Sequence, residues 1–416
     1  MNQWQVERLG RRGDGVAHAL DGSGARALAG LTLPGEVIAG TPVDGRIAQP
    51  AIVTPSPDRV AAPCPHYRAC GGCTLMHARD DFVADWKVGI VTGALAAQGI
   101  AATVAAQHAS PPRSRRRAVL AGRRTKRGAL VGLHARASDV IVDLHECLVV
   151  TPAILAALPL LRELTVAGAS RAGTLDLTVI DGPEGLDVSV TGGKPADAAL
   201  TSDLARLAEA GNLARLTWDG ESLTRRRPWI AIGPARVVPP PGGFLQATAE
   251  GQAALTAAVL AGTAGARRVV DLFAGCGTFS LPLAQTAEVV AIEGLAPPLD
   301  ALQAAWRAMP GLRQLSVESR DLARRPMTAA ELAGFDAIVI DPPRAGATPQ
   351  AAQIAASDVP QVVWISCDPV TFARDARVMV AGGYELARLE VVDQFLWSPH
   401  VETSAVFRRA PGHART

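Results

Sequence analysis

Apolar and polar residues follow different spacings in successive zones of the chain. In the last zone, from residue 241, short apolar runs alternate with stretches of helical character. The apolar runs are RVVDLF (268–273), EVVAIE (288–293), RQLSV (313–317), DAIVID (336–341) and VVWIS (362–366). Strands that alternate with helices form a parallel sheet with helices on both faces. We therefore expect an α/β fold whose C-terminal part is a doubly wound sheet.

The first two zones have shorter apolar runs and denser turn signals. Residues 1–58 place runs such as GVAHAL and EVIAG between glycine-rich turns, a pattern typical of a small β-barrel. Residues 59–240 hold strand-like pieces (LVGLHA, DVIVDL, LDLTVI, LDVSV) and an amphipathic helical pattern at 80–100 that ends at Gly99. This mixture predicts a central α+β domain.

The length of 416 residues is too large for one ordinary core, so two or three domains are expected. A PPPGG segment at 239–243 marks a boundary. We expect the domains to span residues 1–58, 59–240 and 241–416.

Composition restricts the kind of partner. The net charge is +2, so any basic surface for nucleic acid must be local. The longest apolar stretch, CLVVTPAILAALPLL, is shorter than a membrane span and contains two prolines. The N-terminal segment MNQWQVERLGRRGDG lacks the apolar core of a signal peptide. We expect a cytoplasmic protein with no membrane partner, in which clustered cysteines favour metal binding or catalysis over disulfides.

A glycine-rich turn follows the first strand of the last zone. The segment VVDLFAGCGTFS at 269–280 runs from a strand through the turn into a helix, which lets the backbone approach a nucleotide-like ligand closely. Taken alone, the pattern fits a tight strand–helix turn equally well. Glu293 ends the next strand, 18 residues after Gly275, where an acid can bind two ribose hydroxyls. The turn lacks a third glycine, which favours a ligand smaller than a dinucleotide, such as S-adenosylmethionine.

Acidic residues end further strands of the expected sheet. Asp321 follows the third strand, and Asp341 ends the fourth and begins DPPRAG. A single acid at such a position is often a helix cap. In a doubly wound sheet the carboxyl ends of the strands meet at one edge, where ligands bind, so we expect these acids to line a site.

Cys367 follows the fifth strand, on the same edge. Asp368 is placed to cap the next helix, Pro369 suits its first turn, and Gly382-Gly383 can end it. A buried structural cysteine fits this position as well as a nucleophile does. Because a helix N-terminus stabilises a thiolate, we expect the pKa of the Cys367 thiol to be lowered.

Four segments in this order resemble one enzyme family. DLFAGCGTFSLPLA, DPPRAG, SCDPVTFARD and HVETSAV look like motifs of the RNA uracil-5-methyltransferases, which use S-adenosylmethionine. The resemblance implies a Rossmann-like methyltransferase sheet, with Cys367 as nucleophile and Glu402 as general base. It places the cofactor on Gln246, Phe273, Thr278, Glu293, Asp321 and Asp341.

The implied chemistry suits these residue types. C5 of uracil is a poor nucleophile until a thiolate adds at C6, after which C5 can accept a methyl group. A base must then remove the C5 proton and the thiol must leave, so the reaction needs one thiolate and one general base. The target base must leave its stack to reach such a site.

Some positions depart from the family pattern. The family usually has SCNP where this chain reads SCDP, and the segment before HVE reads QFLWSP instead of containing Phe-Pro and Thr. Thr278 and Asp321 stand where Asn is common. These changes affect details of cofactor and substrate contacts and leave the thiol and the base in place.

Four of the six cysteines form a second pattern. CPHYRACGGC supplies Cys64, Cys70 and Cys73, and Cys147 follows in LHECLVV. Four thiolates suit a tetrahedral four-cysteine metal site, and from the spacing alone structural zinc fits as well as iron and sulfur. The resemblance favours a [4Fe–4S] cluster with a structural or RNA-orienting role. We expect the remaining cysteine, Cys276, to pack in the core.

Local basic runs and the first zone suggest RNA as the partner. RSRRRAVLAGRRTKR at 113–127 has eight basic residues in fifteen, which fits a solvated strand pair or a phosphate-binding patch. RRRPW at 225–229 suits stacking and phosphate contact, or a hairpin edge. Residues 1–58 resemble the small TRAM (OB-like) RNA-binding barrel.

The leading hypothesis is a monomeric 5-methyluridine methyltransferase acting on 23S rRNA or a ribosome assembly intermediate. The same chemistry on tRNA is an alternative, disfavoured because the tRNA branch generally lacks the cysteine cluster. A cytosine-5 enzyme would carry Pro-Cys where this chain reads DPPRAG. A non-catalytic iron–sulfur RNA-binding protein leaves Cys367 and Glu402 unexplained, and a small-molecule methyltransferase leaves the first 240 residues unexplained.

Overall fold

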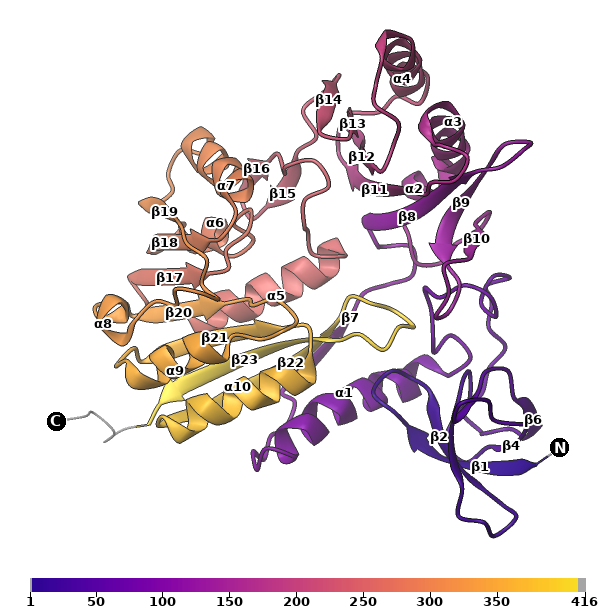
Figure 1. Cartoon of the computed structure of the whole chain (residues 1–416). Helices are drawn as coiled ribbons and strands as arrows, with labels where there is room; N and C mark the ends of the chain where they lie inside the picture. The colour runs from indigo at the N-terminus through magenta and orange to yellow at the C-terminus, as the bar shows by residue number, and fades with distance from the viewer. Residues whose placement is uncertain (1, 411–416) are drawn as a thin grey trace.

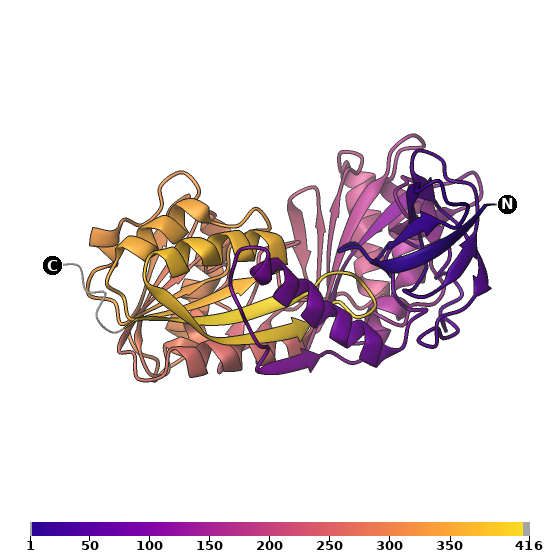
Figure 2. The same cartoon turned by 90° about the horizontal axis from the view of Figure 1, so that it is seen from below.

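The computed structural model describes residues 2–410, so the last six residues of the expected third domain lie outside the described part. The described strands form a six-stranded, a seven-stranded and an eight-stranded sheet, together with a separate hairpin. The six- and seven-stranded sheets lie at one end of an elongated molecule and the eight-stranded sheet at the other (Figures 1 and 2). In the described residues no helix is long and apolar enough to cross a membrane.

The N-terminal zone forms a curled six-stranded sheet with the order β5-β3-β2-β1-β4-β6. Side chains along β1 and β2 alternate between buried and exposed, which puts Trp4 and Val6 into a small core with Ile38. Its strands are β1 (Gln3–Leu9), β2 (Gly15–Ala19), β3 (Arg26–Ala29), β4 (Val37–Ala39), β5 (Arg46–Ile47) and β6 (Ala51–Thr54).

The central sheet has the order β10-β9-β8-β11-β12-β13-β14. Leucines at helical spacing, including Leu161 and Leu204, pack helices α3 and α4 onto it. The elements are β8 (Arg117–Arg124), β9 (Ala129–His134), β10 (Ile141–Asp143), α2 (Pro152–Ala156), α3 (Leu158–Gly168), β11 (Leu175–Gly182), β12 (Gly185–Thr191), α4 (Ala198–Ala210), β13 (Arg215–Trp218) and β14 (Glu221–Thr224). The four strand-like pieces expected in this zone are confirmed as β9 to β12.

The eight-stranded sheet has the order β19-β18-β17-β20-β21-β23-β22-β7, and its five strands from β19 to β21 run parallel. The elements of this part are β15 (Ile230–Ile232), β16 (Ala235–Val237), α5 (Ala249–Gly262), β17 (Arg268–Leu272), α6 (Ser280–Leu283), β18 (Glu288–Glu293), α7 (Ala296–Ala308), β19 (Leu315–Ser319), α8 (Ala329–Leu332), β20 (Ala337–Ile340), α9 (Thr348–Ala356), β21 (Gln361–Ser366), α10 (Pro369–Ala381), β22 (Tyr384–Asp393) and β23 (Glu402–Arg409). Helices α5 and α7 pack in the core on one face, and α9 and α10 in the core on the other. The expected parallel strands and the doubly wound arrangement are confirmed.

Two features of this sheet differ from expectation. Strands β22 and β23 continue it in antiparallel fashion, and β7 (Ala106–Ala109) adds to its edge beside β22. Helix α1 (Asp80–Ala96) packs on α10, and Gly99 follows it in a left-handed conformation, as the sequence indicated. Residues 80–109 therefore pack with the C-terminal part, so the expected central domain, 59–240, is not a single spatial unit. A short strand such as β7, with three of its four residues exposed, carries no alternating pattern that would reveal it.

Side chains of helix α1 bind the loop between β22 and β23. The Lys87 ammonium, fully buried, lies 2.6 Å from Asp393, and it donates to the Phe395 carbonyl at 3.2 Å. The Trp397 indole donates to Asp80 at 2.9 Å. This loop leads directly into Glu402, so α1 helps to position the end of the sheet where the acids gather.

Candidate active site

The glycine-rich turn after β17 wraps around the acid that ends β18. The Gly275 amide donates to Glu293 at 3.2 Å, and the Leu295 amide donates to the other oxygen of that carboxylate at 3.0 Å. A side chain at Gly277 would lie 2.3 Å from Leu302 of α7, so the turn needs glycine for close helix packing. The turn and Glu293 thus form one unit.

The remaining residues of the expected cofactor set occupy different surroundings. Phe273 has a left-handed backbone at the start of the turn, and Thr278 lies half-buried before α6. Asp321 is exposed beyond β19 and accepts from the Ala323 and Arg324 amides, so it stabilises its own turn. Cys276 packs in the core, and burial raises the pKa of its thiol to about 12.

A chain of side-chain amides joins Asp341 to Glu402. Gln246 donates to Asp341 at 3.4 Å and accepts from Gln394 at 2.6 Å. Gln394 also donates to Glu402 at 3.3 Å, and its own oxygen accepts from the Ala247 amide at 2.8 Å. The structure therefore brings Gln246, Asp341 and Glu402 together. Gln394, in the loop before Glu402, was not singled out in the sequence because a lone Gln in an irregular segment gives no signal.

Buried acids give this edge of the sheet a strong preference for positive charge. Burial raises the pKa of Asp271 and of Asp341 to about 7. Burial and the nearby Asp341 raise the pKa of Glu402 well above its usual value. Desolvation is the largest cause of each shift, and neighbouring acids add to it for Asp271 and Glu402. A positively charged ligand at this edge would favour the ionised carboxylates. S-adenosylmethionine carries a sulfonium and an ammonium group.

Cys367 and Glu402 become neighbours through strand pairing. Ser366 of β21 pairs with Thr403 of β23, and the Thr403 hydroxyl donates to the Ser366 carbonyl at 3.2 Å. The next residue along β21 is Cys367, and the residue before Thr403 is Glu402. The carboxyl and the thiol therefore lie at the same point of the sheet edge.

The helix after Cys367 begins as expected, but the thiol's acidity is opposite to expectation. Asp368 caps α10 by accepting from the Val370 and Thr371 amides at 2.9 and 3.2 Å. Burial, followed by Glu402 and Asp341, raises the pKa of the Cys367 thiol to about 11. The expected lowered pKa is wrong because burial and two acids outweigh the helix N-terminus.

Arg344 and His400 complete the surroundings of the thiol. Arg344, in DPPRAG, hydrogen-bonds to Cys367 and lowers its pKa, against the larger effects of burial and the acids. Its guanidinium also lies 3.5 Å from Nδ1 of His400. Burial and Arg344 lower the pKa of His400. The sequence motif DPPRAG was recognised, but its arginine was not assigned a role. Its position just after Asp341 could have indicated that Arg344 lies near the site.

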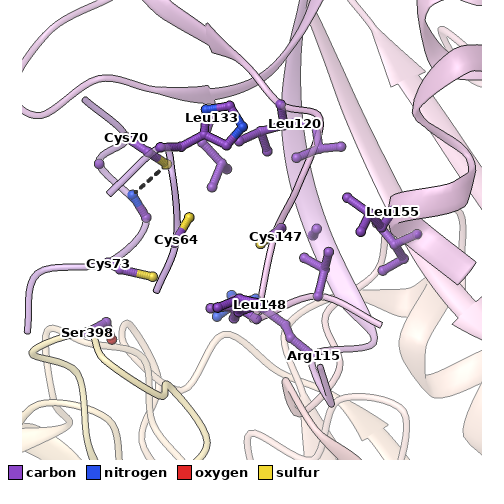
Figure 3. A pocket seen from close by; sticks show the side chains of 18 of the residues that line it. Cys64, Cys70, Cys73, Arg115, Leu120, Leu133, Cys147, Leu148, Leu155 and Ser398 are labelled. Carbon is purple, nitrogen blue, oxygen red and sulfur yellow. Dashed lines mark hydrogen bonds between the residues drawn. The ribbon is translucent and has the colours of Figure 1, made fainter. Parts of the chain in front are cut away.

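The four expected ligand cysteines line one cavity of about 370 Å³. Cys64, Cys70 and Cys73 face Cys147 across it, as Figure 3 shows, and all four are free thiols. Burial and the other cysteines raise the pKa of the Cys73 thiol to about 12. A cationic group bound among the four thiols would favour their thiolate forms. Among the described residues no three metal-binding side chains converge closely enough to hold a single ion.

Part of the central basic run makes internal contacts. Arg116 donates to the Gln246 carbonyl and to Gln252, and Arg117 donates to the Gly242 and Gly243 carbonyls. Arg115 lies over the Phe395 ring at 5.7 Å. Arg116 and Arg117 thus join the central sheet to the segment that carries Gln246, while Lys126 and Arg127 are exposed. A phosphate-binding role for the run stays a prediction.

A doubly wound sheet with a glycine-rich turn and buried acids at the strand ends defines the class of S-adenosylmethionine-dependent methyltransferases. Comparison with known proteins agrees. A sequence model of the family described as tRNA (Uracil-5-)-methyltransferase matches residues 241–410. An uncharacterized RNA methyltransferase of Caulobacter vibrioides is 42% identical over 98% of this chain and 100% of its own length.

Two characterised proteins extend the comparison. The 23S rRNA (uracil(1939)-C(5))-methyltransferase RlmD of Halomonas elongata is 33% identical, covering 99% of this chain and 90% of the relative. The tRNA (uracil-54, C5)-methyltransferase of Pyrococcus abyssi, solved with S-adenosyl-L-homocysteine, has the same fold with a TM-score of 0.76 and 23% identity, over 97% and 99% of the two chains. The chain belongs to the RNA uracil-5-methyltransferase family and is an S-adenosylmethionine-dependent RNA methyltransferase.

Proposed function

We propose that the protein transfers a methyl group from S-adenosylmethionine to C5 of a specific uridine in 23S rRNA, with Cys367 as nucleophile and Glu402 as general base. The observation that carries this proposal is the pairing of β21 with β23, which places the thiol and the carboxyl side by side. The relative from Halomonas elongata named for 23S rRNA supports this substrate over tRNA.

The steps follow from the residues. The Cys367 thiolate forms a bond to C6, and the electron pair moves through the ring so that C5 attacks the methyl carbon of the sulfonium. S-adenosylhomocysteine leaves. The Glu402 carboxylate then takes the C5 proton, and the returning electron pair breaks the C6–sulfur bond and releases the thiolate.

We assign the cofactor to Gln246, Phe273, Thr278, Glu293, Asp321 and Asp341. The acids supply negative charge for the sulfonium and ammonium groups, and Glu293 lies where ribose hydroxyls would bind. Gln246 and Gln394 orient Asp341 and Glu402 relative to each other through their hydrogen bonds.

We also propose that Cys64, Cys70, Cys73 and Cys147 hold a [4Fe–4S] cluster. All four cysteines line one cavity of about 370 Å³, and four thiolates are the usual ligand set of such a cluster. The group supplies no electron to methyl transfer; these residues hold the 64–73 segment against the central sheet. The N-terminal sheet, in our proposal, is a TRAM-like RNA-binding barrel, and the protein works as a cytoplasmic monomer.

Trapping of the covalent adduct tests the proposed function. RNA transcripts of 23S rRNA made with 5-fluorouridine should form a stable complex with the protein and S-adenosylmethionine, because a base cannot remove fluorine as it removes a proton. The complex should survive denaturing gel electrophoresis. It should be absent with Cys367→Ala and unchanged with Lys194→Ala, which alters an exposed residue of the central zone. No complex with the unaltered protein on 23S rRNA, together with one on tRNA, would overturn the substrate assignment.

A further inference from the structure

The turn between β1 and β2 reaches the catalytic cysteine. A cavity of about 160 Å³ is lined by Arg11 and Arg12 of this turn, together with Cys367, Arg344 and His400. The two arginines belong to the N-terminal sheet, more than 300 residues before Cys367 in the chain. The N-terminal zone therefore contributes side chains to the space beside the nucleophile.

Packing fixes the position of this turn. Gly13 has a φ of +81°, and a side chain there would lie 2.8 Å from Thr74, so the turn fits closely against that residue. The Thr74 and Leu75 amides donate to the Trp397 carbonyl at 2.8 and 2.9 Å. Trp397 lies in the loop that leads to Glu402. The turn that carries Arg11 and Arg12 and the loop that leads to Glu402 therefore both contact the segment at residues 74–75.

The cavity has an excess of positive charge. Arg11, Arg12 and Arg344 line it, and the carboxylate that faces them, Asp368, is engaged in capping α10. Within residues 2–410 neither Arg11 nor Arg12 makes an ion pair or a side-chain hydrogen bond, and both are exposed. Unpaired arginines beside a reactive thiol suit a polyanion and disfavour the cationic cofactor.

We propose that Arg11 and Arg12 bind the RNA phosphates next to the target uridine and so present its base to Cys367. This inference rests on the proposed function and names the binding residues for its substrate. Phosphate contacts of this kind fix the register of a nucleic acid without reading its sequence. The N-terminal sheet is then part of the catalytic pocket as well as a module that holds RNA at a distance.

The test compares three variants of the full-length protein on unmodified 23S rRNA transcripts. Arg11→Gln with Arg12→Gln removes both charges, and Arg11→Lys with Arg12→Lys keeps them. Arg171→Gln with Arg307→Gln removes two exposed charges that lie outside the N-terminal sheet and do not line the cavity. Methyl transfer from labelled S-adenosylmethionine gives kcat/KM, and fluorescence anisotropy gives RNA affinity over a range of salt concentrations.

We expect the Gln pair at 11 and 12 to lower kcat/KM by about tenfold or more. The slope of log affinity against log salt should become shallower by about 0.7 for each lost contact with single-stranded RNA. The Lys pair should recover most of both values, and the pair at 171 and 307 should match the unaltered protein. Equal values for the two Gln pairs would overturn the inference. If the unaltered protein methylates no RNA but the Gln pair at 11 and 12 still makes the slope shallower, the proposed function is refuted and the phosphate contact stands.

Discussion

At the scale of single residues, the surroundings of Cys367 and Glu402 disfavour the charged form of each group. The pKa of Cys367 is raised to about 11, and that of Glu402 is raised well above its usual value. Both groups must lose a proton to act in the proposed mechanism. A cationic cofactor beside Asp341 and Glu402 would lower both pKa values, which links the binding of S-adenosylmethionine to the readiness of the thiol.

Replacement of Glu402 by Gln should separate the two halves of the proposed reaction. The thiolate can still add and the methyl group can still transfer, but the C5 proton has no acceptor. We expect turnover to fall by about a thousandfold or more, while a covalent protein–RNA complex accumulates on natural RNA. Denaturing gels with labelled RNA would show this complex.

Glu288→Gln is the matched control, because Glu288 is exposed at the start of β18. It should turn over normally without accumulating a complex. Loss of turnover in Glu402→Gln with no trapped complex would mean that Glu402 acts before methyl transfer.

The rate of methylation should rise with pH. The thiol titrates near its pKa of about 11 in the free protein. Its thiolate fraction therefore increases about tenfold per pH unit between about pH 7 and about pH 9. Deprotonation of Glu402 acts in the same direction, because its pKa is also raised. Measurements of kcat/KM over this range would show an increase, and a rate that falls as the pH rises would contradict the assignment of both groups.

Arg344→Gln should move that pH profile towards higher pH. Arg344 lowers the pKa of the thiol, so its removal raises the thiol pKa further and reduces the thiolate present at neutral pH. Arg344→Lys retains the charge and should lie between the variant and the unaltered protein. A Gln variant with a lower rate at every pH but an unshifted profile would assign Arg344 to RNA binding alone.

At the scale of elements, strand ends were predictable and the irregular segments were not. The five parallel strands and the caps of α10 follow from apolar runs, Asp368 and Pro369, which are local signals. Gln394 and the Arg11–Arg12 turn reach the site through contacts between distant segments, for which spacing in one sequence carries no information. The wrong expectation for the pKa of Cys367 has the same cause, since burial and Glu402 come from tertiary structure.

The contacts of α1 with the loop between β22 and β23 should contribute strongly to the free energy of unfolding of the protein. Lys87→Met leaves Asp393 buried without its partner, so we expect a loss of about 3–5 kcal/mol in the free energy of unfolding. Urea unfolding would measure it. The double variant Lys87→Met with Asp393→Asn should lose less, because no buried charge remains. The exposed Lys194→Met should change little, and an equal effect there would contradict this account.

At the scale of the whole molecule, Cys367 has charges of both signs near it. Glu402 and Asp341 raise the pKa of its thiol, and exposed arginines from the N-terminal turn and DPPRAG line the cavity beside it. The cysteine cavity shares Arg344 and His400 with the cavity beside Cys367. Side chains of the three zones seen in the sequence therefore line these adjoining cavities, although residues 80–109 cross between the zones.

Cys147→Ser should remove one ligand of the proposed cluster and leave the S-adenosylmethionine site unchanged. Protein purified without oxygen should contain iron and acid-labile sulfide, and the variant should lose both. We expect its RNA methylation to fall about tenfold or more, while S-adenosylmethionine binding measured by calorimetry stays unchanged. Zinc in place of iron in the unaltered protein would refute the cluster.

The most direct test of the proposed function is nucleoside mass spectrometry after reaction with methyl-labelled S-adenosylmethionine. Unmodified 23S rRNA and tRNA would be incubated separately with the unaltered protein and with Cys367→Ala. We predict labelled 5-methyluridine in 23S rRNA, none in tRNA and none with the variant. Label that persists in the Cys367→Ala reaction, or label on any base atom other than C5 of uracil, would contradict the account.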